Sequence, residues 1–414
     1  MSEQAASGPI ERRRGEKQER SQQRRARMVD AIVALLASHG IAGLTHRLVA
    51  REAGVSLAAT TYYFDSKFDM VAAASNRILD GYRSAFQRAA RSGRHVSVHD
   101  YVVRLLINAV ERDRTGSVCW TEIMLDAPRH AESLALAQEW FAGLPMIWEG
   151  IAGATGVPTP QAAARSAVDT VIGLMLMVLG LGLTEAQVAA VFLHGAAPQH
   201  AWAPSSAVAV PPAAKPGRKS AETRDRIIAA AIAILTRDGS AAVSYRTVAV
   251  QAGLAPAGPA YHFPTVEGLL AAAQAQLFEN SKQRYRLAAA MDSGPHDLER
   301  LIDRTAVVFL REVTAFGDQN LANFTIWLEA SRRPELRPMI WNSVTDQIRA
   351  WNHVLETMGV ALRPLDALLP QCIFIGKLVR LLAVGAPLQE LENVRRDFAA
   401  DLTALVERRF WLSP

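Results

Sequence analysis

Cysteine is nearly absent from this sequence, because only Cys119 and Cys372 occur among its 414 residues. So few cysteines exclude a disulfide framework or a cysteine-rich zinc site, and they favour a reducing, cytoplasmic location. The first residues are polar and charged, so they lack the apolar core of a signal peptide. The longest apolar run, residues 171–183, is too short to span a bilayer. We therefore expect a buried helix there and no membrane partner.

Catalytic signatures are missing as well. The sequence contains no Walker A loop and no HExxH motif, and its glycine-bearing segments follow no strand pattern. His95 and His99 have the spacing of two metal ligands on one helical turn, but no third ligand accompanies them, so we interpret this segment as a solvated loop. The sequence thus predicts neither an enzyme nor a bound metal or cofactor. An enzyme of unknown type is the most distant alternative.

The chain does have great length and clustered basic charge. A chain of 414 residues is too long for one ordinary core, so two or more domains are expected. The formal net charge is only +5, but the basic residues crowd within 11–27 and 215–220. Such clusters of basic residues fit a nucleic-acid partner. The alternative is that they only keep the surface soluble.

The sequence also repeats itself. Residues 40–64 align without a gap with residues 239–263, and ten of the twenty-five positions are identical. Farther along, at an offset of 203, Asp126, Trp148, Gly173 and Gly182 correspond to Glu329, Trp351, Gly376 and Gly385. The repeated unit is therefore a whole domain of about 200 residues, far longer than a solenoid repeat.

The residues at the start of each copy predict the same local structure, described here for the first copy. A helix with apolar residues at helical spacing ends at Gly40, since glycine takes a left-handed backbone at little steric cost. Thr45 can cap a second helix, Gly54 can end it in a tight turn, and Ser56 can cap a short third helix. Helix, glycine turn and helix form the helix-turn-helix arrangement, whose second helix fits the major groove of DNA.

The segment from Thr45 to Lys67 resembles the DNA-binding domain of TetR-family transcriptional regulators. It reads T-x3-VA-x2-AGVS-x5-YYF-x2-K, with the AGVS and tyrosine-rich segments of that family. The whole chain is similar to two such regulators fused head to tail. The resemblance implies an all-α fold in which each unit has a three-helix DNA-binding domain and a C-terminal helical domain for ligand binding and dimerisation. Family members generally pair through their last two long helices, so the two copies would pair within one chain as a pseudo-dimer.

The candidate DNA-contacting residues come from both motifs. The resemblance implies phosphate contacts by Thr45, Tyr62, Tyr63 and Lys67. We expect Arg47 to reach the backbone or a base, and Ser56, Leu57, Ala58, Thr60 and Thr61 to face base edges. The second copy offers Ser244, Arg246, Ala257, Tyr261 and His262. The base-facing side chains are small, which favours readout by thymine methyl contact, water and DNA shape.

The second copy departs from the motif at several positions. Ala255 replaces the capping serine and Val266 replaces the lysine. We expect Pro256 at the first position of the third helix and Pro259 at the fourth, where a missing N–H removes a helical hydrogen bond. We favour an altered but working DNA reader. The alternative is a degenerate copy that is kept only for pairing.

The C-terminal regions suggest a ligand cavity in at least one copy, because tryptophan and methionine occur among long apolar helices. The candidate lining residues are Trp120, Met124 and Trp148 in the first copy and Trp327 and Trp351 in the second. Core packing is the alternative explanation for all of them.

The expected domain boundaries follow from these patterns. They are a disordered basic arm (1–23), DNA-binding domain one (24–70, motif 45–64), C-terminal domain one (71–195), a linker rich in Ala, Pro and Ser (196–219), DNA-binding domain two (220–269, motif 244–263) and C-terminal domain two (270–414). The first copy is residues 24–195 and the second copy residues 220–414.

These patterns predict a transcriptional regulator, most simply a repressor released by a small apolar or amphipathic effector. Its partners are double-stranded DNA, the effector and the other copy in the chain, and the fused copies would read an asymmetric operator. A small-molecule sensor with only weak or architectural DNA contact is the alternative function. A homodimer of whole chains and activation rather than repression also stay open.

Overall fold

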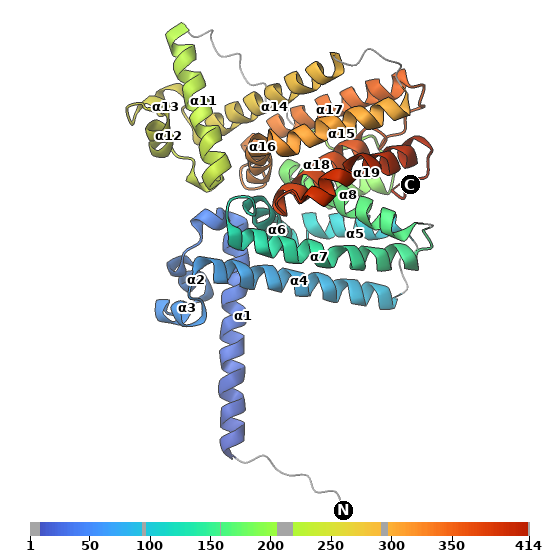
Figure 1. Ribbon diagram of the computed structural model, residues 1–414. Coiled ribbons are helices and arrows are strands. Elements are labelled where there is room, and N and C mark those ends of the chain that lie inside the picture. The colour runs from blue at the N-terminus through green and yellow to red at the C-terminus, as the bar shows by residue number, and fades with distance from the viewer. Residues whose placement is uncertain (1–8, 93–96, 158, 205–217, 291–296, 413–414) are drawn as a thin grey trace, which may run out of the picture.

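Every regular element in the described residues is a helix, which confirms the all-α class (Figure 1). The computed structural model describes residues 9–92, 97–157, 159–204, 218–290 and 297–412. The first helices are α1 (Pro9–Gly43), α2 (His46–Ala53), α3 (Leu57–Tyr63), α4 (Lys67–Ser92), α5 (Val98–Val110), α6 (Arg114–Asp126), α7 (Ala131–Ala154), α8 (Pro160–Leu181), α9 (Glu185–Phe192) and α10 (Pro198–Ala201). The second half contains α11 (Arg218–Asp238), the 3₁₀ turn η1 (Ser240–Ala242), α12 (Tyr245–Ala252), α13 (Gly258–His262), α14 (Val266–Ala290), α15 (Leu298–Thr314), α16 (Gly317–Glu329), the turn η2 (Pro334–Leu336), α17 (Arg337–Thr357), α18 (Leu368–Ala383) and α19 (Leu388–Val406).

Two segment boundaries and one loop differ from the sequence prediction. The arm predicted as disordered is helical from Pro9 onward, because α1 continues through it. The first part of the predicted linker is folded, since Trp202 is buried against Phe192 and its indole N–H donates to the carbonyl of Gln187 at 3.0 Å. His99 lies in the first turn of α5 rather than in a loop, and its predicted companion His95 lies outside the described residues.

Gly40 interrupts α1 as predicted. Its φ of 66° is in the left-handed region, so the helix breaks there before the short final turn. A Cβ at this position would lie 2.6 Å from a carboxylate oxygen of Glu122, which accepts a hydrogen bond from the backbone N–H of Ile41. The left-handed backbone therefore favours glycine, and a Cβ would also displace the Glu122 carboxylate.

The two copies pair within the chain through α8 and α18, which cross in the middle of the molecule (Figure 1). A Cβ added to Gly173 would lie 2.0 Å from the carbonyl oxygen of Cys372, and one added to Gly376 would lie 1.7 Å from the carbonyl oxygen of Asp169. The two glycines correspond at the 203 offset, and so do Asp169 and Cys372. The crossing therefore repeats the isologous contact of a two-fold dimer inside one chain.

The resemblance implies a bundle of the last two helices of each copy, which are α8 and α9 in the first and α18 and α19 in the second, and the surroundings of the crossing differ in part from it. Helix α8 also packs against α7, α16 and α17, and α19 contacts both α18 and α8. Helix α9, expected in the bundle, packs instead on α5 and α10.

Two segments, Gln18–Gly43 and Pro160–Leu181, are long and apolar enough to span a membrane, but 89% of the window in the second is buried within the protein. The apolar run of α8 is thus a core helix.

Candidate DNA interface and ligand cavity

The second helix of each DNA-binding domain begins and ends as the sequence predicts. Thr45 caps α2 through its side-chain oxygen, which accepts from the N–H of Leu48 at 3.3 Å. Ser244 caps α12 and forms a reciprocal capping box with Thr247. Gly54 ends α2 with a φ of 64°, and its counterpart Gly253 ends α12 with a φ of 63°. The two turns therefore have the same backbone conformation at the glycine.

The third helix of the first copy presents most of the predicted residues to solvent. Ser56 caps α3 by accepting from the N–H of Ala59 at 3.2 Å. Ser56, Leu57, Ala58 and Thr61 are exposed, as is Arg47 on α2. Thr60, however, is fully buried, and its hydroxyl donates to the carbonyl of Leu57 at 2.8 Å. The prediction that Thr60 faces base edges is wrong, because it shares the inward face of α3 with Phe64, four residues later.

The third helix of the second copy starts later than expected. Helix α13 spans only Gly258–His262, and Pro259 lies in its first turn, where a missing N–H removes no helical bond. The expectation that Pro256 opens the helix and Pro259 disrupts its fourth position is therefore wrong. Pro259 is buried like Thr60, so it does not face DNA either. Ala257 precedes the helix without a side-chain cap, and it is exposed.

The ends of the two third helices are built alike. Tyr62 is 80% exposed and Tyr261 is 84% exposed, so both phenols are available to a phosphate. Each stacks edge-on against the next ring, Tyr63 or His262. The hydroxyl of Tyr63 also forms a 2.6 Å hydrogen bond with Ser21 of α1.

The α4 and α14 starts differ in charge. Lys67 opens α4, is partly exposed, and has no hydrogen-bond or ion-pair partner among the described residues. Val266 opens α14 at the equivalent position. The first copy therefore has a cation available beside its third helix, and the second copy lacks one there.

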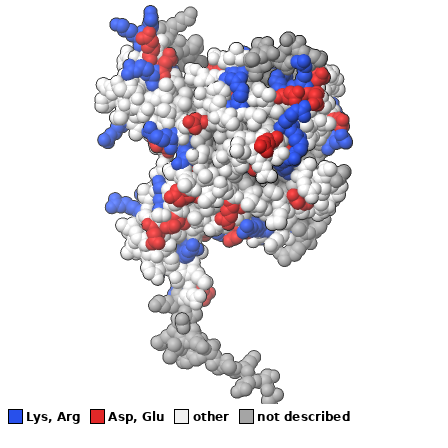
Figure 2. All heavy atoms as spheres, viewed as in Figure 1, with Lys and Arg blue, Asp and Glu red and all other residues white. Residues whose placement is uncertain are grey.

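Both DNA-binding domains lie on one side of the molecule, at the left in Figure 1. Figure 2 shows Lys and Arg side chains along this edge, over both domains. Arg246 is exposed on α12, and Ser244 is partly exposed at its start. Two helices on one side, with cations beside them, can approach the same face of a duplex.

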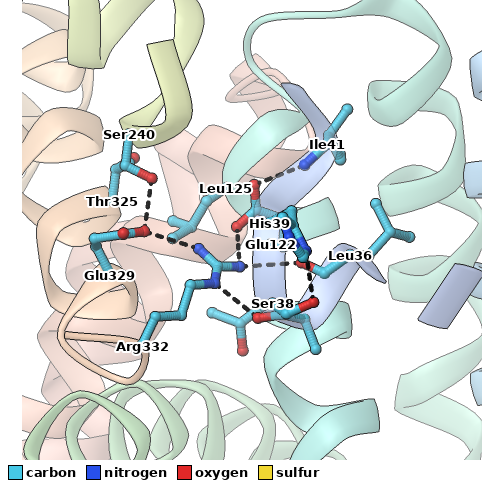
Figure 3. A network of polar contacts seen from close by, with 12 residues as sticks. Leu36, Ser38, His39, Ile41, Glu122, Leu125, Ser240, Thr325, Glu329 and Arg332 are labelled. Carbon is cyan, nitrogen blue, oxygen red and sulfur yellow. Dashed lines mark hydrogen bonds and ion pairs between the residues drawn. The ribbon is translucent and has the colours of Figure 1, made fainter. Parts of the chain in front are cut away.

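A polar network joins the two copies beside the first DNA-binding domain (Figure 3). Arg332, which follows α16, donates to the carbonyls of Leu36 and Ala37 of α1 at 3.1 and 2.7 Å. It also pairs with Glu122 at 2.8 Å and with Glu329 at 3.1 Å. Burial opposes ionisation of Arg332, but the two carboxylates raise its pKa above the usual value. Arg332 thus fastens the second copy's C-terminal domain to the first helix of the first copy.

Arg129, after α6, makes the reciprocal contact. Its guanidinium donates to the carbonyls of Leu235 and Thr236 of α11 and to the hydroxyl of Thr325, each at 2.8 Å. Arg129 corresponds to Arg332 at the 203 offset, and the carbonyls that they bind correspond at the 199 offset. Each C-terminal domain therefore holds the first helix of the other copy's DNA-binding domain.

The two arginine contacts differ in charge. Thr325 stands at the position equivalent to Glu122, so Arg129 meets a neutral hydroxyl where Arg332 meets a carboxylate. Burial lowers the pKa of Arg129, whereas the pKa of Arg332 is raised. The contact that holds the first DNA-binding domain is therefore the more strongly charged one.

Buried charges at the crossing are also unequal between the copies. Asp169 of α8 is fully buried and pairs with Lys377 at 2.7 Å and with Arg380 at 2.6 Å, both on α18. Burial opposes ionisation of Asp169, but Arg380 and Lys377 outweigh it and lower the pKa of this carboxyl. Lys377 also lies 3.4 Å from Asp397, and burial raises the pKa of nearby Asp401 to about 6. The first copy supplies the central anion and the second copy the cations.

A cavity of about 470 Å³ lies in the C-terminal domain of the second copy, among α14, α15, α16, α17 and α18. The predicted residues Trp327 and Trp351 line it. In the first copy, by contrast, Met124 and Trp148 are buried in the core, and Trp120 packs edge-on against Trp140 and Phe141 at ring distances of 5.9 and 6.4 Å. These three candidates of the first copy thus pack in its core.

The sequence of the second copy differs at the positions of these packed rings. At the 203 offset, Trp120, Trp140 and Phe141 correspond to Asn323, Ser343 and Val344. Of these three residues only Asn323 lines the cavity, so asparagine in place of Trp120 leaves space where the first copy has an aromatic ring. Among the described residues, no group of three or more His, Cys, Asp or Glu side chains is arranged to hold a metal.

Family comparisons agree with these geometries. The N-terminal model of bacterial regulatory proteins of the tetR family matches residues 28–74. The model of the tetracyclin repressor-like C-terminal domain matches twice, over residues 95–199 and 296–408, and so covers more than half of the chain. The chain belongs to the TetR family and is a DNA-binding transcriptional regulator with two C-terminal domains.

Solved structures of the family are similar to part of the chain. The multidrug binding protein EbrR, complexed with imidazole, aligns with 44% of this chain and 94% of its own at 26% identity and a TM-score of 0.36. A TetR-family member from Streptomyces coelicolor A3 aligns with 45% of this chain and 98% of its own, also at 26% identity and a TM-score of 0.36. No curated protein matches the chain.

Sequence reasoning missed several residues of these contacts. Arg129 and Arg332 occur at equivalent positions after α6 and α16, so the duplication itself was a signal that could have found them. Asp169, Lys377 and Gln371 carried no such signal, because each lies in an apolar helix and has no polar counterpart at the 203 offset. Their one weak signal is that polar residues are rare in the buried interior of apolar helices.

Proposed function

We propose that this regulator acts as a repressor that reads an asymmetric operator with both of its DNA-binding domains and is released by a small molecule bound in the second copy. The proposal places the protein in the cytoplasm and requires no second chain. The observation that carries it is the charge arrangement at the crossing of α8 and α18.

That arrangement favours pairing of unlike copies over pairing of like copies. Asp169 meets Lys377 and Arg380 only when α8 packs on α18. In a pair of α8 helices, Leu174 and Met177 would occupy the positions of these cations, and a buried carboxylate would have no partner. In a pair of α18 helices, Lys377 and Arg380 would lose Asp169 and keep only Asp397 and Glu390 of their own copy. The α8 pair therefore leaves a buried charge uncompensated, which is strongly unfavourable, and the α18 pair gives up the two ion pairs with Asp169.

Because the two copies expose different residues on their third helices, we expect them to bind different half-sites of the operator. The third helix of the first copy exposes Leu57, Ala58 and Thr61, while the second copy exposes Ala257 and Ala260 before and within a shorter helix. The two should therefore prefer different bases, and an operator for this chain need not be a palindrome.

The cavity and the arginine contacts suggest how an effector would act. Phe324 and Trp327 of the cavity wall belong to α16, and the same helix leads to Glu329 and Arg332, which hold α1. A ligand that favours another position of α16 would displace the DNA-binding domain of the first copy. We therefore expect the first copy's half-site to be released first.

Light scattering and DNA footprinting on the chain's own upstream DNA test the proposal together. One chain that protects two adjacent major grooves of unlike sequence is the expected outcome. Two chains on a perfect palindrome, with binding retained when residues 239–263 are disrupted, would contradict it. The half-site of the first copy is the one whose protection is weakened by Lys67→Ala. Adding an effector should expose this half-site first.

A further inference from the structure

The cavity of the second copy contains a buried side-chain amide without a partner. Gln371 of α18 is 2% exposed and lines the cavity, and neither its Nε2 nor its Oε1 has a hydrogen-bond partner among the described residues. Trp327 of α16 is 1% exposed, also lines the cavity, and has an unpartnered Nε1–H. Buried polar groups are nearly always paired, so these atoms point to a ligand that pairs them.

The rest of the wall is mainly aromatic. Phe278, Phe324, Trp351 and Phe374 contribute rings from four different helices. The volume of about 470 Å³ is within the range of cavities that bind small molecules. Rings on several sides of a cavity favour a flat, apolar body, because aromatic groups stack or meet edge-on.

The charge of the lining disfavours a cation. Among the described residues that line the cavity, none is Asp or Glu, whereas Arg286, Arg304 and His353 are present. The nearby carboxylate of Glu312 accepts from the lining residue Asn320 and is already paired with Arg284 at 2.7 Å. A cationic ligand would therefore meet cations without a compensating anion.

We propose that this cavity binds a flat, apolar molecule that carries a carboxamide or lactam group. The N–H of the ligand donates to Gln371 Oε1, and its carbonyl oxygen accepts from Gln371 Nε2 and from Trp327 Nε1. A carboxylate satisfies the two donors but faces Oε1 with a second acceptor, so it binds less well. The inference rests on the proposed function, because it names the chemical class of the effector.

Three probes of nearly equal size test the ligand class, namely 2-naphthamide, 2-naphthoate and 2-naphthylmethylammonium. Each is titrated calorimetrically into the full chain without DNA. The expected order is amide tightest, carboxylate at least tenfold weaker, and no detectable binding of the ammonium compound. Binding of the ammonium probe as tightly as the amide, or no binding of any probe, would overturn the proposal.

The Gln371→Leu variant supplies a readout that needs no ligand. Leucine of similar volume removes an unpaired buried amide, so the melting temperature of the ligand-free protein should stay equal or rise. Affinity for 2-naphthamide should fall at least tenfold. The control Gln389→Leu, at an exposed position of α19, should change neither quantity. A lower melting temperature for Gln371→Leu would mean that the amide is already paired, and it would refute the proposed contact.

A band-shift assay with the same probes separates this inference from the proposed function. If 2-naphthamide binds the wild type in the expected order but does not release DNA, the ligand class is supported and release by ligand is wrong. If it releases DNA from the wild type and fails to do so from Gln371→Leu, both are supported.

Discussion

The two C-terminal domains have helices at matching positions, but the side chains packed between these helices differ. Helices α6 and α16 begin and end 203 residues apart, and α7 and α17 end at the same offset. The first copy packs Trp120, Trp140 and Phe141 together, whereas the second encloses a cavity of about 470 Å³. In a homodimer one sequence has to serve both subunits. In a fused chain the two copies can be packed differently.

The DNA-binding domains differ in a parallel way. The first keeps the serine cap of α3 and a lysine at the start of α4, and the second has an uncapped five-residue α13 and a valine. The copy with the capped third helix and the lysine therefore packs Trp120, Trp140 and Phe141 together, and the copy with the cavity lacks both the cap and the lysine. Arg332 connects the copy that has the cavity to the DNA-binding domain of the first copy.

The largest effect is expected from the charge asymmetry at the crossing. Asp169→Asn removes the anion that Lys377 and Arg380 share, so the free energy of unfolding should fall by about 3–5 kcal/mol. The matched control Asp303→Asn breaks a pair with Arg395 whose side chains are both 52% exposed. Exposed pairs contribute about 1 kcal/mol or less. Urea denaturation measures the free energy of unfolding of both variants. Equal losses in the two variants would contradict the proposal that the buried Asp169 pairs favour packing of α8 on α18.

The crossed arginines give the next largest difference. Arg332→Ala leaves Glu122 and Glu329 without this cation, and we expect a loss of about 1.5–3 kcal/mol in unfolding free energy. Arg129→Ala leaves mainly neutral acceptors and should cost less. A band-shift assay should also find that Arg332→Ala binds effector but no longer releases DNA. An equal or greater effect of Arg129→Ala would contradict the asymmetry.

The lysine at the start of α4 should set part of the affinity difference between half-sites. Lys67→Ala is expected to weaken binding to all sequences and to reduce the slope of log K against log salt by about 0.9. Val266→Lys should increase the slope by a similar amount in the second copy. Fluorescence anisotropy at several salt concentrations measures both slopes. If Lys67→Ala binds as the wild type does at every salt concentration, Lys67 does not contact phosphate.

The helix caps should produce the smallest difference. Ser56→Ala removes the acceptor for Ala59 N–H and should lower stability by about 1 kcal/mol. Ala257→Ser in the second copy should change it very little, because Ala257 has helical φ and ψ angles of −80° and −12° rather than the extended ones of a capping residue. Thermal unfolding compares the two variants. A clear gain from Ala257→Ser would show that the second copy can be capped.

Much of the local structure was predictable because its causes lie close together in the sequence. Caps, glycine turns and helical periodicity depend on residues three or four apart, which is why Thr45, Gly54 and Ser56 have the expected local roles. Thr60 was misassigned because α3 has only seven residues, too few for a clear periodicity. The start of α13 was misjudged because Pro256 and Pro259 can each stand in the first turn of a helix, and local pattern does not decide between them.

The sequence by itself determined the duplication, the all-α class, the helix-turn-helix motifs and the family, since each depends on local pattern or on comparison of one copy with the other. Only the tertiary structure decided that Trp120 fills its domain while Asn323 leaves space, and that Arg129 and Arg332 cross to the opposite copy. Cavities and crossed contacts depend on side chains that converge from helices far apart in the chain. Their volumes and charges balance only when the whole fold is assembled.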